Sequence, residues 1–141
     1  MKSKATVVWA NSGNIGFGPV SSQSEALERV YNAYNILDSE DEEKSTEELI
    51  AASHAACFTF KLCSLLDQSG FKPEFIETTA EVIYDKNSNL HSHLKVMATI
   101  PGISAHKFLE RANHAKVNCL VSKALGMHIT MEAIIRELAI A

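Results

Sequence analysis

Hydrophobic and polar positions alternate along two neighbouring stretches in the second half of the chain. Residues 75–84 and 90–100 both alternate with a period of two, the pattern of half-buried strands, and the turn residues DKNSN separate them. We therefore predict a β-hairpin in this region. The positions expected to face inward on its second strand are Leu90, Ser92, Leu94, Val96, Ala98 and Ile100.

A long apolar run precedes this hairpin and predicts a helix. The run LIAASHAACFTFKLCSLLDQ contains no helix breaker before Gly70, and Ser45 with Glu48 fits a capping box at its start. We expect one helix of roughly 22 to 24 residues. Its apolar positions do not form a single stripe, which predicts burial on several sides.

The two ends of the chain supply the remaining elements. Residues 4–10 and 17–22 are expected to form a β-hairpin around the turn cluster NSGNIG, and residues 25–35 are interpreted as extended. Ser104 can cap a second helix. Cys119 falls on the inward face of that helix, with Phe108, if the helix extends so far. MHITMEAIIREL is predicted to be the last strand.

The order of these elements predicts an α+β fold with mainly antiparallel sheets and a long buried central helix. With 141 residues the chain is expected to form a single domain, 1–141. The acidic run DSEDEEK at residues 38–44 is interpreted as a solvated loop. The glycines of SGNIGFG open no helix, which argues against a phosphate-binding βαβ unit.

Composition narrows the function classes. A net charge of -4 without a basic stripe argues against nucleic acid as a partner. No uninterrupted apolar run reaches ~18 residues and the first residues do not resemble a signal peptide, so we expect a cytoplasmic protein without a membrane partner. His91 and His93 have strand spacing and no third ligand nearby in the sequence, which argues against a metal site.

The three cysteines are the candidate reactive residues of this sequence. A free cysteine is more often a small buried hydrophobe than a reactive group, and Cys63 is interpreted in this way because it lies about 120° around the helix from Cys57. Cys57 and Cys119 come from different elements that both face the core. A thiolate that attacks a peroxide becomes a sulfenic acid, which a second thiol converts to a disulfide. The residues alone leave open which thiol chemistry, if any, this pair performs.

Two motifs carry a resemblance to a known family. STEELIAASHAACFTFKL, residues 45–62, resembles the central-helix signature of the OsmC/Ohr family of osmotically induced and organic hydroperoxide resistance proteins. AKVNCLVSKAL, residues 115–125, is similar to the second motif of that family. The two cysteines at the centres of these motifs are 62 residues apart, and the predicted order of elements agrees with the family fold.

The resemblance implies a function and a site. Cys57 would be the peroxidatic cysteine, Cys119 the resolving cysteine and Glu47 the acidic site residue. The protein would be a thiol-dependent peroxidase that reduces organic hydroperoxides to alcohols through a Cys57 sulfenic acid and a Cys57–Cys119 disulfide. A small or lipoyl-type thiol would re-reduce the disulfide, without a cofactor. The family also implies an intertwined homodimer with its sites at the subunit interface.

The family pattern includes an arginine in the N-terminal segment that steadies the thiolate. In this sequence the glycine-rich turn SGNIGFG, where that arginine would often be found, has no basic residue. Arg29 is the only arginine before the central helix and is the default substitute. His54, one helical turn before Cys57, is the other candidate, and its alternative is a packed core histidine. Leu120 stands where the family has proline. Two alternatives to the peroxidase therefore stay open: a binding or stress-response protein with weak or no turnover, and a structural dimer whose cysteines are all core.

Overall fold

The structure is a computed structural model, and it divides the chain into two compact units, Met1–Glu47 and Glu48–Ala141. Each unit is described by itself, and the single domain 1–141 stays a prediction. Side chains are described from residue 46 to residue 136, except at residue 88. The backbone is described over residues 5–7, 10–12, 15–22, 31–35, 39–87 and 89–136.

In the described residues of the first unit, three short strands pair with a fourth, β3. This strand, Ile15–Ser22, pairs antiparallel with β1 (Ala5–Val7), β2 (Ala10–Ser12) and β4 (Tyr31–Asn35). The predicted N-terminal hairpin is confirmed by the pairing of β1 with β3, but the turn expected at residues 11–16 is too long, because β2 and the start of β3 occupy most of it. β4 lies within the stretch that was expected to be extended, and residues 25–30 of that stretch lie outside the described residues.

The long helix α1 runs from Ser39 to Gln68 and is 30 residues long. It begins six residues before Ser45, so the predicted capping box is wrong, and so is the loop assigned to the acidic run. Glu and Lys favour helix, and acidic residues are stabilised near a helix N-terminus, which explains why this run is helical.

The predicted end of α1 is confirmed. Gly70 has a φ of 83°, which is the left-handed conformation that favours glycine after a helix. The N–H of Phe71 donates to the carbonyl of Leu66 (2.9 Å) and the N–H of Gly70 to that of Asp67 (3.0 Å). These two bonds form a Schellman motif, which satisfies carbonyls that the end of the helix leaves free.

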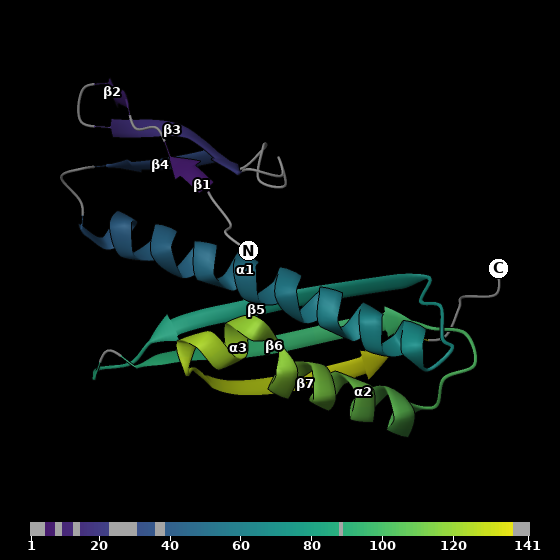
Figure 1. Cartoon of the computed structure of the whole chain (residues 1–141). Coiled ribbons are helices and arrows are strands. Elements are labelled where there is room, and N and C mark those ends of the chain that lie inside the picture. Colours follow the sequence, from purple (N-terminus) through teal and green to yellow (C-terminus); the bar gives the residue numbers. More distant parts are fainter. Residues whose placement is uncertain are drawn as a thin grey trace. The chain divides into compact units, whose positions relative to one another are not determined.

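The second unit is built on a mixed three-stranded sheet (Figure 1). β5 (Phe75–Tyr84) and β6 (Leu90–Thr99) form the predicted antiparallel hairpin. β7 (His128–Ile135) pairs with β6 in parallel and is the exception among the described strand pairs, which are otherwise antiparallel. Parallel neighbours need a crossover connection, and here α2 (Ala105–Asn118) and α3 (Leu120–Leu125) form it.

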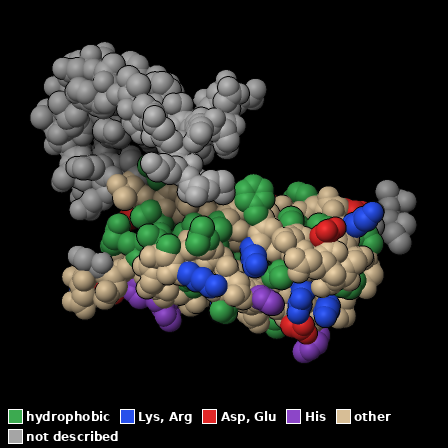
Figure 2. Space-filling view, in the orientation of Figure 1, with side chains coloured by type: hydrophobic (Ala, Val, Ile, Leu, Met, Phe, Trp, Pro, Cys, Tyr) green, Lys and Arg blue, Asp and Glu red, His purple; other side chains and the backbone are tan. Residues whose placement is uncertain are grey.

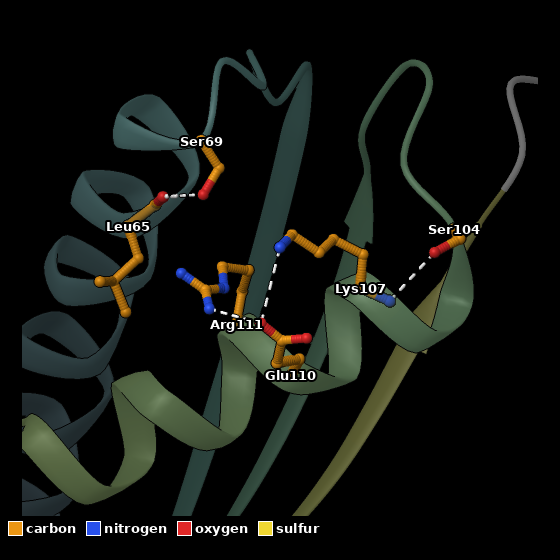
Figure 3. A network of polar contacts seen from close by, with 6 residues as sticks. All are labelled: Leu65, Ser69, Ser104, Lys107, Glu110 and Arg111. Atoms are coloured by element: carbon orange, nitrogen blue, oxygen red, sulfur yellow. Dashed lines mark hydrogen bonds and ion pairs between the residues drawn. The ribbon is translucent and has the colours of Figure 1, made fainter.

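The start of α2 follows the prediction. Ser104 is the N-cap, and its hydroxyl accepts a hydrogen bond from the backbone N–H of Lys107 at 3.0 Å (Figure 3). Arg111 donates to the Glu110 carboxylate at 2.6 Å, and the Lys107 ammonium lies 3.5 Å from the same oxygen. The guanidinium of Arg111 is therefore paired on its own helix.

The core of the second unit lies between the sheet and the helices α1 and α2. The inward positions predicted on β6 are buried from Ser92 to Ala98, in strict alternation with more exposed neighbours. The core cluster contains Phe58, Leu62, Leu65, Leu66, Leu94, Val96, Ala98, Ile100, Phe108, Ala112, Ala115 and Cys119.

One stripe of α1 is apolar and exposed, and we call it the open face: Leu49, Ala52, Ala56 and Phe60. Phe60 is 76% exposed, and Figure 2 shows apolar side chains gathered on the surface over this helix. The prediction that α1 is buried on several sides is thus wrong within one chain. The spacing of the open face is helical, and its two alanines would allow a second backbone to approach closely.

Residues Thr46–Gln68 of α1 are long enough and apolar enough to cross a membrane, with a mean hydropathy of 1.6. The same residues include Phe58, Leu62 and Leu66, which are fully buried in the core of the second unit. These three side chains anchor the segment in that core, and 28% of its most apolar stretch is buried within one chain.

Candidate active site

The structure brings Cys57 and Cys119 together. Cys57 is half-buried on α1, whereas Cys119 is fully buried at the junction where α2 ends and α3 begins. The second helix stops at Asn118, one residue short of Cys119, but the predicted inward position of this cysteine is confirmed. Both thiols are free, and a hydrogen bond joins their sulfur atoms.

Main-chain amides surround the sulfur of Cys57. Burial by itself raises the pKa of this thiol, but hydrogen bonds from the N–H of Val121, the thiol of Cys119 and the N–H of Leu120 outweigh burial. The pKa of Cys57 is therefore below its ordinary value. The fraction of Cys57 in the thiolate form, which is the nucleophilic form of cysteine, is therefore larger than for an unperturbed thiol at the same pH.

Cys119 is shifted in the opposite direction. Burial raises its pKa, and the hydrogen bond to Cys57 raises it further, because a thiol that donates to a neighbouring thiolate holds its proton. Hydrogen bonds from the backbone and hydroxyl of Ser122 oppose this rise without cancelling it. The pKa values of the two thiols are thus moved apart, that of Cys57 downward and that of Cys119 upward, an asymmetry that separates their chemical roles.

His54 is fully buried, and both of its ring nitrogens lie against serine hydroxyls. Nδ1 is 2.7 Å from the Oγ of Ser92, and Nε2 is 2.9 Å from the Oγ of Ser122. Burial lowers the pKa of His54, so the ring is neutral at pH 7. The hypothesis that His54 pairs with the Cys57 thiolate as an imidazolium is therefore wrong, and the alternative of a packed core histidine fits its position.

The other two predicted site residues are not placed relative to the thiols. Glu47 lies on α1, ten residues before Cys57 and in the first unit, and Arg29 lies outside the described residues. The roles assigned to these two side chains stay predictions. Cys63 is half-buried, and burial raises the pKa of its thiol, as expected for a structural cysteine.

Within the described residues, no three His, Cys, Asp or Glu side chains are grouped so that they could hold a metal ion. His91 and His93 have different partners. Nε2 of His91 lies 2.9 Å from the carboxylate of Asp85. This contact is the largest of several hydrogen bonds that lower the pKa of Asp85 to about 2. His93 lies 2.6 Å from the hydroxyl of Thr130.

Sequence comparison assigns the chain to a family. The family model for OsmC-like protein matches residues 39–133. The chain belongs to the OsmC-like protein family. It is 34% identical over 133 residues to peroxiredoxin OsmC of Escherichia coli strain K12, which covers 92% of this chain and 93% of that protein.

Solved structures support the same OsmC-like fold. The organic hydroperoxide resistance protein OhrB of Bacillus subtilis matches with a TM-score of 0.56 and 19% identity, over 96% of this chain and 98% of that chain. A hypothetical protein from Aquifex aeolicus matches with a TM-score of 0.71 and 8% identity, over 98% of both chains. At these identities the likeness concerns the fold alone.

Leu120 is one position at which this OsmC-like site differs from the family motif that it resembles, which has proline there. Replacing Leu120 by proline is expected to raise the pKa of Cys57, because proline has no N–H to donate to the sulfur. The rate of Cys57 alkylation would then begin to rise at a higher pH than in the unmodified protein. The ultraviolet absorbance of the thiolate, followed against pH in a Cys63→Ser background, measures this shift.

The backbone at this position accommodates proline. Cys119 has φ -63° and ψ 130°, the extended conformation that a residue before proline prefers, and proline is well tolerated at the first position of a helix. Leu120→Ala is the matched control, since it removes an exposed side chain and keeps the N–H. An unchanged thiolate titration in Leu120→Pro, with the fold intact, would contradict the assignment of this donor.

Proposed function

We propose that this protein is a cysteine-based peroxidase that reduces organic hydroperoxides to alcohols. The observation that carries the proposal is the hydrogen-bonded pairing of Cys57 and Cys119, which lowers the pKa of the first thiol, while the pKa of the second is raised. The relative named peroxiredoxin OsmC, which is 34% identical over most of the chain, supports a peroxidase-like role.

In the first step the Cys57 thiolate attacks one oxygen of the hydroperoxide. The O–O bond breaks, the alkoxide takes up a proton and leaves as the alcohol, and Cys57 becomes a sulfenic acid. The sulfur gives up two electrons in this step. In the second step the sulfur of Cys119 attacks that of Cys57, the S–O bond breaks, and the proton of the thiol leaves with the hydroxyl group as water.

An external thiol completes the cycle. A dithiol of the small or lipoyl type supplies two electrons and two protons, which return Cys57 and Cys119 to their reduced forms. No cofactor is needed for this sequence. Arg29 would steady the Cys57 thiolate and pair with Glu47, as the family resemblance implies.

The open face of α1 supports assembly as a homodimer. Exposed apolar stripes of this kind mark interaction surfaces, and the stripe runs directly beside Cys57 on the same helix. A second copy of the chain seated there would both remove the apolar surface from water and approach the reactive sulfur. We also propose a single functional domain, 1–141, and a cytoplasmic location, where thiol reductants are available.

Thiol counting tests the proposed function. One equivalent of cumene hydroperoxide should remove two of the three free thiols of each chain, and a dithiol should restore them. Peptide mapping of the oxidised protein should identify a Cys57–Cys119 disulfide. A chain that keeps all three thiols after this treatment would instead favour a binding or stress-response role without turnover.

A further inference from the structure

Three buried polar side chains lie behind the thiol pair, and the proposed reaction does not yet use them. Ser92, His54 and Ser122 are respectively 2%, 0% and 9% exposed, and they come from β6, α1 and α3. Burying polar groups is unfavourable unless each is hydrogen-bonded. Ser122 is the link to the chemistry, because its hydroxyl contacts both Nε2 of His54 and the sulfur of Cys119.

The directions of these hydrogen bonds follow from the number of protons. The single hydroxyl proton of Ser122, if donated to the sulfur of Cys119, leaves its oxygen to accept from His54. The neutral ring of His54 must then carry its proton on Nε2 and accept at Nδ1, where the hydroxyl of Ser92 is the donor at 2.7 Å. In this series of hydrogen bonds each group donates to the next one toward the thiols, and the last bond is the one from Cys119 to Cys57.

We infer that His54, held by Ser92, is a positioning residue that fixes the hydroxyl of Ser122 as a hydrogen-bond donor to the resolving thiol, Cys119. The inference rests on the proposed function and adds a role to its second step. As the S–S bond forms and the S–O bond of the sulfenic acid breaks, Cys119 loses its proton to the departing hydroxyl group. The hydroxyl of Ser122 stabilises the negative charge that develops on the attacking sulfur during this exchange.

Because these hydrogen-bonded residues are buried, a donor role is favoured over one in which His54 takes up the proton of Cys119. Burial lowers the pKa of His54 and raises that of Cys119, so a full proton transfer from the thiol to the ring is unfavourable. A neutral donor chain costs no charge separation in the core. It also keeps the hydroxyl of Ser122 from rotating away, since its oxygen is occupied by the ring N–H.

Step-resolved kinetics test the inference. In Ser122→Ala, formation of the Cys57 sulfenic acid should be within about twofold of the unmodified rate, whereas formation of the disulfide should slow by about tenfold to a hundredfold, the scale of one hydrogen bond to a charged group. Dimedone should therefore trap more sulfenic acid. A disulfide step that is as fast in Ser122→Ala as in the unmodified protein would overturn the inference.

Two substitutions at His54 separate positioning from mere packing. Glutamine keeps an N–H near the place of Nε2, so His54→Gln should retain most of the rate of disulfide formation, whereas His54→Leu fills the core but should be as slow as Ser122→Ala. Equal slowing in both variants would count against a donor role. Thr59→Val is the matched control, because it removes a hydroxyl of α1 that is bonded to Ala55 and Thr78 and takes no part in the hydrogen bonds of His54. It should leave both steps unchanged.

Two readouts do not depend on peroxide and so separate failure of this inference from failure of the proposed function. With Cys57 converted by Ellman's reagent to a mixed disulfide in a Cys63→Ser background, attack by Cys119 releases thionitrobenzoate, and Ser122→Ala should slow this release similarly. Nitrogen NMR of the ring of His54 should show the proton on Nε2. A proton on Nδ1 would overturn the inference even if peroxide turnover is rapid.

Discussion

Replacing Cys57 by serine is expected to reduce peroxide turnover by at least about 10³-fold, the scale on which loss of a nucleophile acts. A serine hydroxyl stays protonated at neutral pH, so the hydrogen bonds from Val121 and Leu120 would have no thiolate to stabilise. The fold should be unaffected because the substitution is nearly isosteric. Consumption of cumene hydroperoxide in the presence of a dithiol measures the loss.

The other two cysteines provide the matched variants. Cys63→Ser should keep full turnover, because the side chain of Cys63 has no part in the thiol pair. Cys119→Ser should still form a sulfenic acid on Cys57, which dimedone traps, but should form no intramolecular disulfide. Undiminished turnover in Cys57→Ser would remove the basis of the proposed peroxidase.

The second large effect is expected on stability. Phe58→Ala should lower the free energy of unfolding by about 3–5 kcal/mol, because the ring of Phe58 is fully buried between α1 and the rest of the core and its removal leaves a cavity. Denaturant titration of the reduced protein, followed by circular dichroism, measures the change. A loss below 1 kcal/mol would contradict the packing of this helix on the core.

Phe60, two residues further along α1, is the control for this prediction and a test of assembly. The ring of Phe60 is 76% exposed in one chain, so Phe60→Ala should barely alter the unfolding of a monomer. If the open face is covered by a second copy, the variant should instead weaken dimer formation. Sedimentation equilibrium distinguishes the two results, and a monomeric unmodified protein would contradict the proposed homodimer.

Much of the fold could be predicted from local pattern. The alternation over residues 75–84 and 90–100 gave the hairpin of β5 and β6 and the inward face of β6, since the period of two is set by strand geometry alone. Gly70 correctly marked the end of α1, because only a left-handed residue closes a helix in that way. The start of α1 was missed because the acidic run has both loop-like charge and good helix propensity.

Contacts between elements that are far apart in the sequence could not be predicted from the local pattern of residues. The same strand pattern fits either direction of pairing, so nothing in residues 128–135 distinguished a parallel β7 from an antiparallel one. The thiol pair was suggested by the motifs and is close in space. Its hydrogen-bond partners could not be predicted, since the amides at positions 120 and 121 are present in almost any sequence and Ser92 is 38 residues from His54.

The use of backbone amides around Cys57 has a consequence for how this site tolerates change. A charged side chain that activates a sulfur can be lost by a single substitution, whereas nineteen of the twenty amino acids supply the same N–H at either position. Leu120 and Val121 can therefore vary widely in size and polarity while the reactivity of the neighbouring sulfur persists. The site depends instead on the backbone conformation that places these N–H groups, so insertions or deletions between α2 and α3 should reduce the reactivity of Cys57 more than most substitutions there.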